Sequence, residues 1–179
     1  MPRISAHQLS VFAIGAVLLA ILGGAAIAAQ DKYSVQVPDG LALSEFRGYE
    51  TWQVVGASQS GDIISVILGN PAMIQAYQAG LPAEGKKIPD GAKMVKIHWK
   101  TKKSPDGFPA SVPDTLHDLD LMAKDSKRFS GTGGWGYGQL NYDSASDAFT
   151  PLGRGAGCGF ACHTKVAAKD YVFTAFPKR

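Results

Sequence analysis

The sequence predicts a single α+β domain that consists mainly of an antiparallel β-sheet with a few short helices. Three observations predict this fold class. Short segments with alternating or continuous apolar residues are separated by turns rich in glycine and proline, which is typical of antiparallel strands. Helix signals are confined to two short stretches. The chain that follows an N-terminal apolar segment has about 150 residues, the size of one domain with one hydrophobic core.

The N-terminal segment is predicted to be a signal peptide over residues 1–28. Arg3 precedes an uncharged run over residues 11–29, and Ala26-Ile27-Ala28 gives the small-x-small pattern of a cleavage site. An uncleaved membrane anchor is the alternative, because about 20 apolar residues can cross a bilayer. Either segment would deliver the domain to the periplasm. Residues 29–45 are then expected to form an N-terminal loop, and residues 46–179 the folded domain.

The charge pattern argues against nucleic acid as a partner. Lys and Arg number 18 against 15 Asp and Glu, for a formal net charge of +3. The basic residues are scattered along the chain, whereas nucleic-acid binding needs a basic patch or stripe.

The first half of the domain is predicted to contain two strands and a helix. Residues 49–56 are rich in aromatic and β-branched side chains, and residues 63–68 are apolar on both faces, so both segments favour strands. Asn70 followed by Pro71 is typical of a helix start, and the helix is expected to reach Gly80. Residues 81–91 are expected to form a loop.

Two further strands show a clear division between faces. In residues 93–100, Val95, Ile97 and Trp99 alternate with Met94, Lys96 and His98, so the first set is expected in the core and the second on the opposite face. From the pattern alone, Lys96 and His98 are predicted to face solvent. In residues 116–123, Leu119 and Leu121 alternate in the same way with Asp118, Asp120 and Met122.

Residues 131–142 interleave glycine with aromatic residues. On a strand, Trp135, Tyr137 and Gln139 would share one face and bare glycines the other. A flat group such as a porphyrin could lie against the glycine face, although a neighbouring strand or a bulge explains such glycines more often.

The strongest chemical motif is the stretch 158–163, Cys-Gly-Phe-Ala-Cys-His, which holds both cysteines of the chain. Two nearby thiols can bond the vinyl groups of a haem, and a histidine directly after the second thiol can bind its iron. We therefore predict one covalent haem c per chain, attached through Cys158 and Cys162, with His163 as the iron ligand. Three residues separate the cysteines where the common motif has two, and a bulge at Gly159 is expected to absorb the extra one.

Two alternatives for the motif stay open from the residues alone. Cys158 and Cys162 could form a disulfide in an exported protein, or could be unrelated structural thiols. A closed zinc site is disfavoured, because it needs four nitrogen or sulfur ligands and the motif supplies three.

Taken together, the segments resemble the cytochrome P-460 family, which includes the β-sheet cytochromes c′. The resemblance extends from about residue 46 to the end of the chain. It is carried by residues 49–56, the Asp90-Gly91 turn before Lys96, the run 124–129 (Lys-Asp-Ser-Lys-Arg-Phe), residues 135–137 (Trp-Gly-Tyr) and the motif 158–163 with the segment after it.

The resemblance implies a mostly antiparallel homodimeric protein that holds a five-coordinate c-type haem with an open distal side. Its namesake members oxidise hydroxylamine at a haem that is cross-linked to a lysine, and Lys96 matches that lysine. Asp120 matches a carboxylate that acts as an acid or base near the iron, although the family enzyme in this comparison has glutamate there.

Three functions follow as hypotheses. The first is a periplasmic enzyme that oxidises hydroxylamine and passes electrons to a soluble acceptor, with Lys96 and Asp120 as catalytic residues. The second is a protein that binds or scavenges nitric oxide without turnover and leaves Lys96 chemically free. The third is an electron carrier in which Met94, Met122 or His98 binds the sixth position of the iron. A chain that has lost haem altogether is a fourth alternative.

Overall fold

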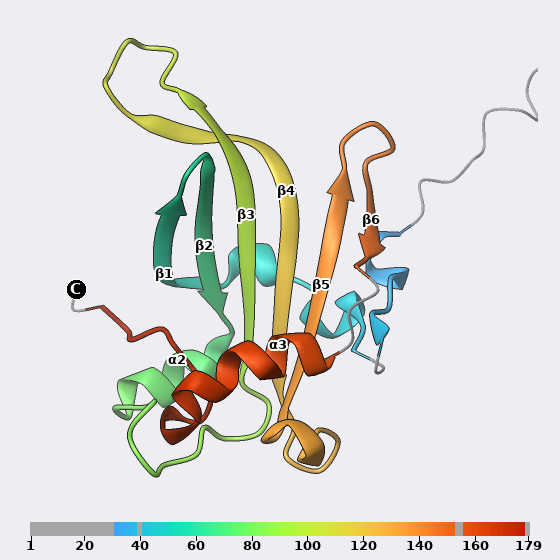
Figure 1. Ribbon diagram of the computed structural model, residues 1–179, viewed down its shortest axis with the longest axis vertical. Coiled ribbons are helices and arrows are strands. Elements are labelled where there is room, and N and C mark those ends of the chain that lie inside the picture. Colours follow the sequence, from blue (N-terminus) through green and yellow to red (C-terminus); the bar gives the residue numbers. More distant parts are fainter. Residues whose placement is uncertain (1–30, 39–40, 153–155, 178–179) are drawn as a thin grey trace, which may run out of the picture. The chain divides into compact units, whose positions relative to one another are not determined.

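The computed structural model describes residues 31–38, 41–152 and 156–177. They form a six-stranded antiparallel sheet in which each strand pairs with its neighbours in sequence (Figure 1). The strands are β1 (Gln53–Ser60), β2 (Ile63–Gly69), β3 (Lys93–Lys103), β4 (Ser111–Lys124), β5 (Trp135–Asp143) and β6 (Ala148–Pro151). The predicted α+β fold, mainly β, is therefore confirmed. The predicted signal peptide, residues 1–28, lies outside the described residues.

Two α-helices accompany the sheet in the described ranges, α2 (Pro71–Gln78) and α3 (Ala156–His163). The predicted start of α2 is confirmed, because the side chain of Asn70 accepts a hydrogen bond from the backbone N–H of Met73 at 3.0 Å. None of the described helices is long and apolar enough to cross a membrane. Short 3₁₀ helices complete the fold: η1 (Lys32–Ser34), η3 (Leu43–Phe46), η4 (Tyr49–Thr51), η5 (Ser130–Thr132) and η6 (Thr164–Lys169).

The sheet carries a hydrophobic cluster on each face, where the sequence predicted one core. The alternation along β3 and β4 divides their side chains as expected. Val95, Ile97 and Leu119 join one cluster. This cluster also includes Leu41, Leu43 and Phe46, which precede β1. Met94 and Met122 join the other cluster, which includes residues of α2 and of the C-terminal segment. Each face of the sheet is therefore covered, and the haem motif belongs to the second face.

The predicted strand 49–56 is only partly correct. Residues Tyr49–Thr51 form η4, and the strand begins at Gln53. Gly48 adopts φ of 82° before η4, and its carbonyl accepts hydrogen bonds from both the backbone N–H and the hydroxyl of Thr51. These contacts close a tight turn, which overrides the β propensity of the aromatic residues.

The hairpin of β3 and β4 is longer than predicted, and β6 was missed. Pro113 lies inside β4 opposite Thr101, next to a shift in strand register, where a missing N–H donor is tolerated. The strand β6 is a four-residue edge strand that pairs with β5. Its alternation is too short to give a pattern.

Candidate haem site

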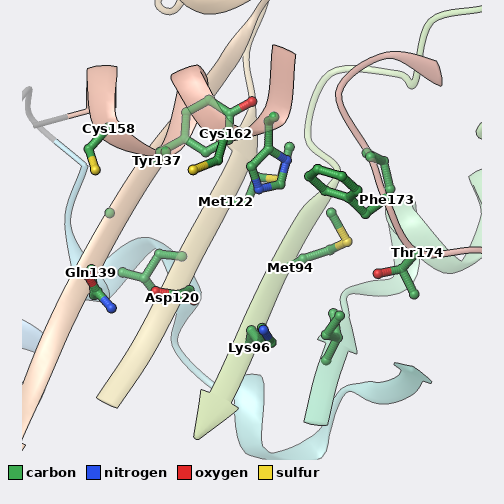
Figure 2. A pocket seen from close by; sticks show the side chains of 16 residues that line it. Met94, Lys96, Asp120, Met122, Tyr137, Gln139, Cys158, Cys162, Phe173 and Thr174 are labelled. Carbon is green, nitrogen blue, oxygen red and sulfur yellow. The ribbon is translucent and has the colours of Figure 1, made fainter. Parts of the chain in front are cut away.

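A cavity of about 390 Å³ lies between the second face of the sheet, α3 and the C-terminal segment (Figure 2). Strands β2 to β5 supply one wall, α3 supplies another, and residues 172–174 close a third side. The lining residues are Ile67, Met94, Lys96, Asp120, Leu121, Met122, Tyr137, Gly138, Gln139, Cys158, Gly159, Cys162, His163, Val172, Phe173 and Thr174. The structure therefore brings the predicted attachment, ligand and catalytic residues into one pocket, whereas His98, offered as a possible sixth ligand of the iron, is not among the lining residues.

The two cysteines of α3 lie one helical turn apart on the side of the helix that faces the pocket (Figure 2). Residues four apart in an α-helix are neighbours on its surface. Both thiols are free and exposed, so no disulfide joins Cys158 to Cys162. The predicted bulge at Gly159 is wrong, because α3 is a continuous α-helix from Ala156 to His163 and the extra residue simply completes one turn.

Gly159 has a packing role instead. A Cβ atom at this position would lie 2.7 Å from the Cβ atom of Tyr137 on β5, closer than real Cβ contacts allow. The bare backbone of α3 therefore rests directly on this tyrosine.

His163 ends α3 and is oriented for metal binding. Its Nδ1 lies 2.6 Å from the backbone carbonyl oxygen of Tyr171, so Nδ1 carries the proton and donates it. The Nε2 atom keeps its lone pair, which is the arrangement of histidines that bind metals. The rings of Tyr137 and Phe173 flank the imidazole, each with its centroid 5.0 Å from that of His163.

A buried ion pair stabilises the turn that carries the carbonyl of Tyr171. Asp170 and Tyr171 both adopt positive φ, 50° and 65°, so the chain turns sharply just before the carbonyl that holds His163. Such backbone conformations cost free energy and persist where the surroundings fix them. Here Lys124 Nζ binds Asp170 Oδ2 at 2.8 Å, with both side chains almost fully buried, and Trp135 donates its indole N–H to the Asp170 carbonyl.

Lys96 and Asp120 lie side by side on β3 and β4 as directly paired residues. Asp120 pairs in turn with Gln139 of β5, and all three line the pocket (Figure 2). Within the described residues, the amino group of Lys96 has no hydrogen-bond or ion-pair partner. The prediction that Lys96 simply faces solvent is therefore corrected, since it is half-buried at the pocket wall.

The carboxylate of Asp120 has a partner that the sequence analysis missed. His98 Nε2 lies 3.0 Å from Asp120 Oδ2, and His98 Nδ1 lies 2.8 Å from the hydroxyl oxygen of Ser65 on β2. The alternation already placed His98 on the same face as Lys96. The alternation does not reveal the strand register, and the register brings His98 within reach of Asp120 on the next strand.

The glycine face of β5 is not a surface for a flat cofactor. A Cβ atom at Gly136 would meet the ring of Phe129, and one at Gly138 would meet Val37, so protein side chains already fill that face. The aromatic face carries the site instead. Tyr137 lines the pocket with a buried hydroxyl that has no hydrogen-bond partner among the described residues. Burial raises the pKa of this hydroxyl above its ordinary value, so Tyr137 is neutral.

The donor set fits a haem. Two free thiols, one imidazole with an available Nε2 and a cavity with mainly apolar walls lie together, and these are the groups that hold c-type haem in proteins.

Comparison with known proteins agrees with this description. A family model described as Cytochrome P460 matches residues 46–174, which is most of the chain. No curated protein matches the chain at a significant level.

Proposed function

The chain belongs to the cytochrome P460 family, and from this premise we propose that it is an exported enzyme that oxidises hydroxylamine. Membership of the family makes the chain a haem-binding, iron-containing cytochrome. We further propose that the haem is attached covalently, that Lys96 and Asp120 act in the reaction, and that the protein works in the periplasm.

Covalent attachment through Cys158 and Cys162 is the first part of the proposal. Each thiol would add its sulfur and its proton across one vinyl group, a step that needs no oxidant. The two free thiols face the same pocket from one side of α3, which supports this assignment. His163 would bind the iron through Nε2, because its Nδ1 is already committed to the carbonyl of Tyr171.

The second part concerns Lys96 and Asp120. Haem, when bound, supplies an iron that can accept electrons from hydroxylamine. A substrate that loses electrons also loses protons, and the Asp120 carboxylate lines the pocket where it can accept them. Lys96 lies opposite Asp120, and a lysine must be neutral to form a bond to carbon, a state that burial beside an apolar cofactor favours. The bond would replace one N–H of the amine and the C–H of a haem carbon, and an external two-electron oxidant such as a peroxide would take up the two electrons and two protons released.

One observation carries the proposal. The amine of Lys96 lines the same pocket as the attachment motif and has no partner among the described residues, whereas most lysine amines at a protein surface face open water. A lysine cross-linked to haem, as in the hydroxylamine-oxidising members of the family, would explain both its position and its lack of a partner.

The test compares Lys96→Met with Lys100→Met, which changes an exposed lysine of the same strand outside the pocket. Both proteins are produced in a host that attaches c-type haem. We expect Lys96→Met to keep its haem, to show the optical spectrum of an ordinary c-type haem and to lose hydroxylamine oxidation. Lys100→Met should resemble the wild type. Identical spectra for the wild type and Lys96→Met would contradict the cross-link. If the wild type itself holds haem but does not oxidise hydroxylamine, nitric oxide binding would be favoured.

An electron carrier is the second candidate, because Met94 and Met122 line the same pocket as His163 and either sulfur could bind iron. His98 does not suit that role, since it is not among the residues that line the pocket. A six-coordinate, low-spin spectrum that does not respond to nitric oxide would favour this candidate.

The compartment and the partners complete the proposal. The N-terminal segment supports export to the periplasm, with cleavage near Ala29 or retention as an anchor. We expect a homodimer that passes electrons to a soluble acceptor. N-terminal sequencing of the exported protein and its mass in solution test these two points.

A further inference from the structure

Beside the haem pocket, polar side chains from β3 and β4 converge on a second site. His98, Asp118 and Asp120 each direct one ligand atom to a common point, and these atoms all lie within 4.8 Å of one another. The strand register produces this cluster, because His98 pairs with Asp118 and the neighbouring Lys96 pairs with Asp120. We propose that the three side chains bind a divalent transition-metal ion such as Zn²⁺.

His98 is oriented for this role. Its Nδ1 lies 2.8 Å from the Ser65 hydroxyl, which is itself buried. In the metal-bound protein, Nδ1–H would donate to the Ser65 hydroxyl, and the lone pair of Nε2 would bind the ion. A hydrogen bond from the second ring nitrogen is what usually fixes the tautomer of a metal-binding histidine.

Asp118 gives an independent observation, a buried carboxylate oxygen without a hydrogen-bond partner among the described residues. Only 10% of its side chain is exposed, and its Oδ1 atom is buried without a hydrogen-bond partner in the described part of the chain. This oxygen lies 3.6 Å from His98 Nε2, too far for a hydrogen bond. An unsatisfied buried carboxylate oxygen is costly, and an ion is one of the groups that explain such an atom. The other oxygen of Asp118 binds Nδ1 of His117 at 2.6 Å.

A proton on His98 satisfies only part of the cluster. A single N–H at Nε2 can donate along the 3.0 Å contact to Asp120, which leaves Asp118 Oδ1 without a donor. A metal ion would satisfy all three atoms. Bonds of about 2.1 Å with tetrahedral or octahedral angles place neighbouring ligand atoms about 3.0 to 3.4 Å apart. The N–O distances in the structure, 3.0 and 3.6 Å, are close to that range.

The donor set indicates the class of metal. One imidazole nitrogen with two carboxylate oxygens suits zinc, iron or manganese, and zinc binds most nitrogen and oxygen sites more tightly than the other two. Three protein ligands leave at least one position for water, as in zinc sites that are not purely structural. Asp120 lines the haem pocket and also belongs to this cluster. The inference does not depend on hydroxylamine oxidation.

The experiment measures Zn²⁺ binding to the full mature protein, as exported, by isothermal titration calorimetry. The wild type is compared with His98→Ala, with Asp118→Asn and with Asp114→Asn, which changes an exposed aspartate of the same strand. The free cysteines could also take up zinc if haem is absent, but they are the same in all four proteins. The difference between variants therefore reports on the cluster alone, whether or not haem is attached.

At the cluster itself we expect one equivalent of Zn²⁺ in the wild type and in Asp114→Asn. Because losing an outer partner of a ligand already costs 10- to 100-fold in affinity, loss of a direct ligand in His98→Ala or Asp118→Asn should weaken binding at least about 100-fold. Asp118→Asn keeps the shape of the side chain, so the comparison survives if His98→Ala folds poorly. Equal zinc binding in the wild type and Asp118→Asn would overturn the proposal and leave a hydrogen bond from His98 Nε2 to Asp120 as the explanation of the cluster.

Discussion

Asp120 is the residue on which the proposed chemistry depends most directly. Its side chain is 42% exposed in the structure, lines the pocket and pairs with Lys96 across two strands. The sequence comparison left the reach of an aspartate in doubt, because the related enzyme has a longer glutamate. In the structure this shorter side chain still lines the pocket, and His98 holds one of its oxygens.

We predict that Asp120→Asn lowers the turnover number for hydroxylamine by about 10² to 10⁴, the usual range for loss of a general acid or base. The amide keeps the size of the side chain but cannot accept the proton. Steady-state kinetics with Asp114→Asn as the matched control would check this. Turnover equal to that of the wild type would remove Asp120 from the mechanism.

The ion pair between Lys124 and Asp170 is expected to stabilise the folded protein. Lys124→Met removes an almost fully buried cation beside this carboxylate, and among the described residues the exposed Lys87 at 3.1 Å would remain as its cationic partner. Breaking a buried pair by removal of one partner costs about 3 to 5 kcal/mol, and we expect a loss near the lower end because Lys87 stays.

Urea unfolding of the haem-loaded protein measures this loss. Lys127→Met, which changes an exposed lysine of the same turn, should change the free energy of unfolding by less than about 0.5 kcal/mol. A similarly small effect of Lys124→Met would show that the buried pair does not stabilise the turn at Asp170 and Tyr171.

At the scale of elements, the contact between α3 and β5 sets the position of the motif. Gly159→Ala would place a methyl group 2.7 Å from the Tyr137 side chain, and overpacking of this kind costs about 1 to 3 kcal/mol. We predict lower stability and less haem per chain for this variant. Denaturant unfolding and the ratio of haem absorbance to protein give the two readouts.

Gly157→Ala is the control, because no atom lies within 4 Å of a Cβ at that position of the same helix. Alanine is the better helix former by about 1 kcal/mol, so this variant should be as stable as the wild type or more stable. Equal behaviour of the two variants would contradict the close contact of α3 with β5.

An ion pair joins Glu45 of η3, which precedes β1, to Arg128 in the turn between β4 and β5. Two guanidinium nitrogens lie 2.8 and 3.1 Å from the two carboxylate oxygens of Glu45. Partial burial acts to raise the pKa of Glu45, but the hydrogen bonds from Arg128 and from the Ala42 N–H outweigh it and hold this pKa below its ordinary value.

A lowered pKa in the folded state means that Glu45 stabilises the protein above its unfolded pKa of about 4.3 and that this stabilisation is lost as the pH falls through the folded value. The difference in free energy of unfolding between wild type and Glu45→Gln should therefore shrink from about pH 6 to about pH 3. Urea unfolding at several pH values tests the trend, and a difference independent of pH would refute it.

At the scale of the whole molecule, alternation predicted the division of β3 and β4 between two faces, and the motif predicted that the two thiols and His163 lie close together. Both are properties of residues close in sequence. The shared pocket could be proposed only through the family resemblance, since it depends on strand register and on how α3 crosses the sheet (Figure 1). The partnership of His98 with Asp120 was missed for the same reason, because no local pattern records which residues face each other across two strands.

The central claim is that one haem is bonded to both ends of this pocket, at the cysteines of α3 and at Lys96 of β3. Mass spectrometry of a tryptic digest, made from denatured protein purified out of a host that attaches c-type haem, tests it most directly. The account predicts a single porphyrin-bearing species that joins the peptide of Lys96 to the peptide of Cys158 and Cys162. A porphyrin-free peptide at either position would contradict it.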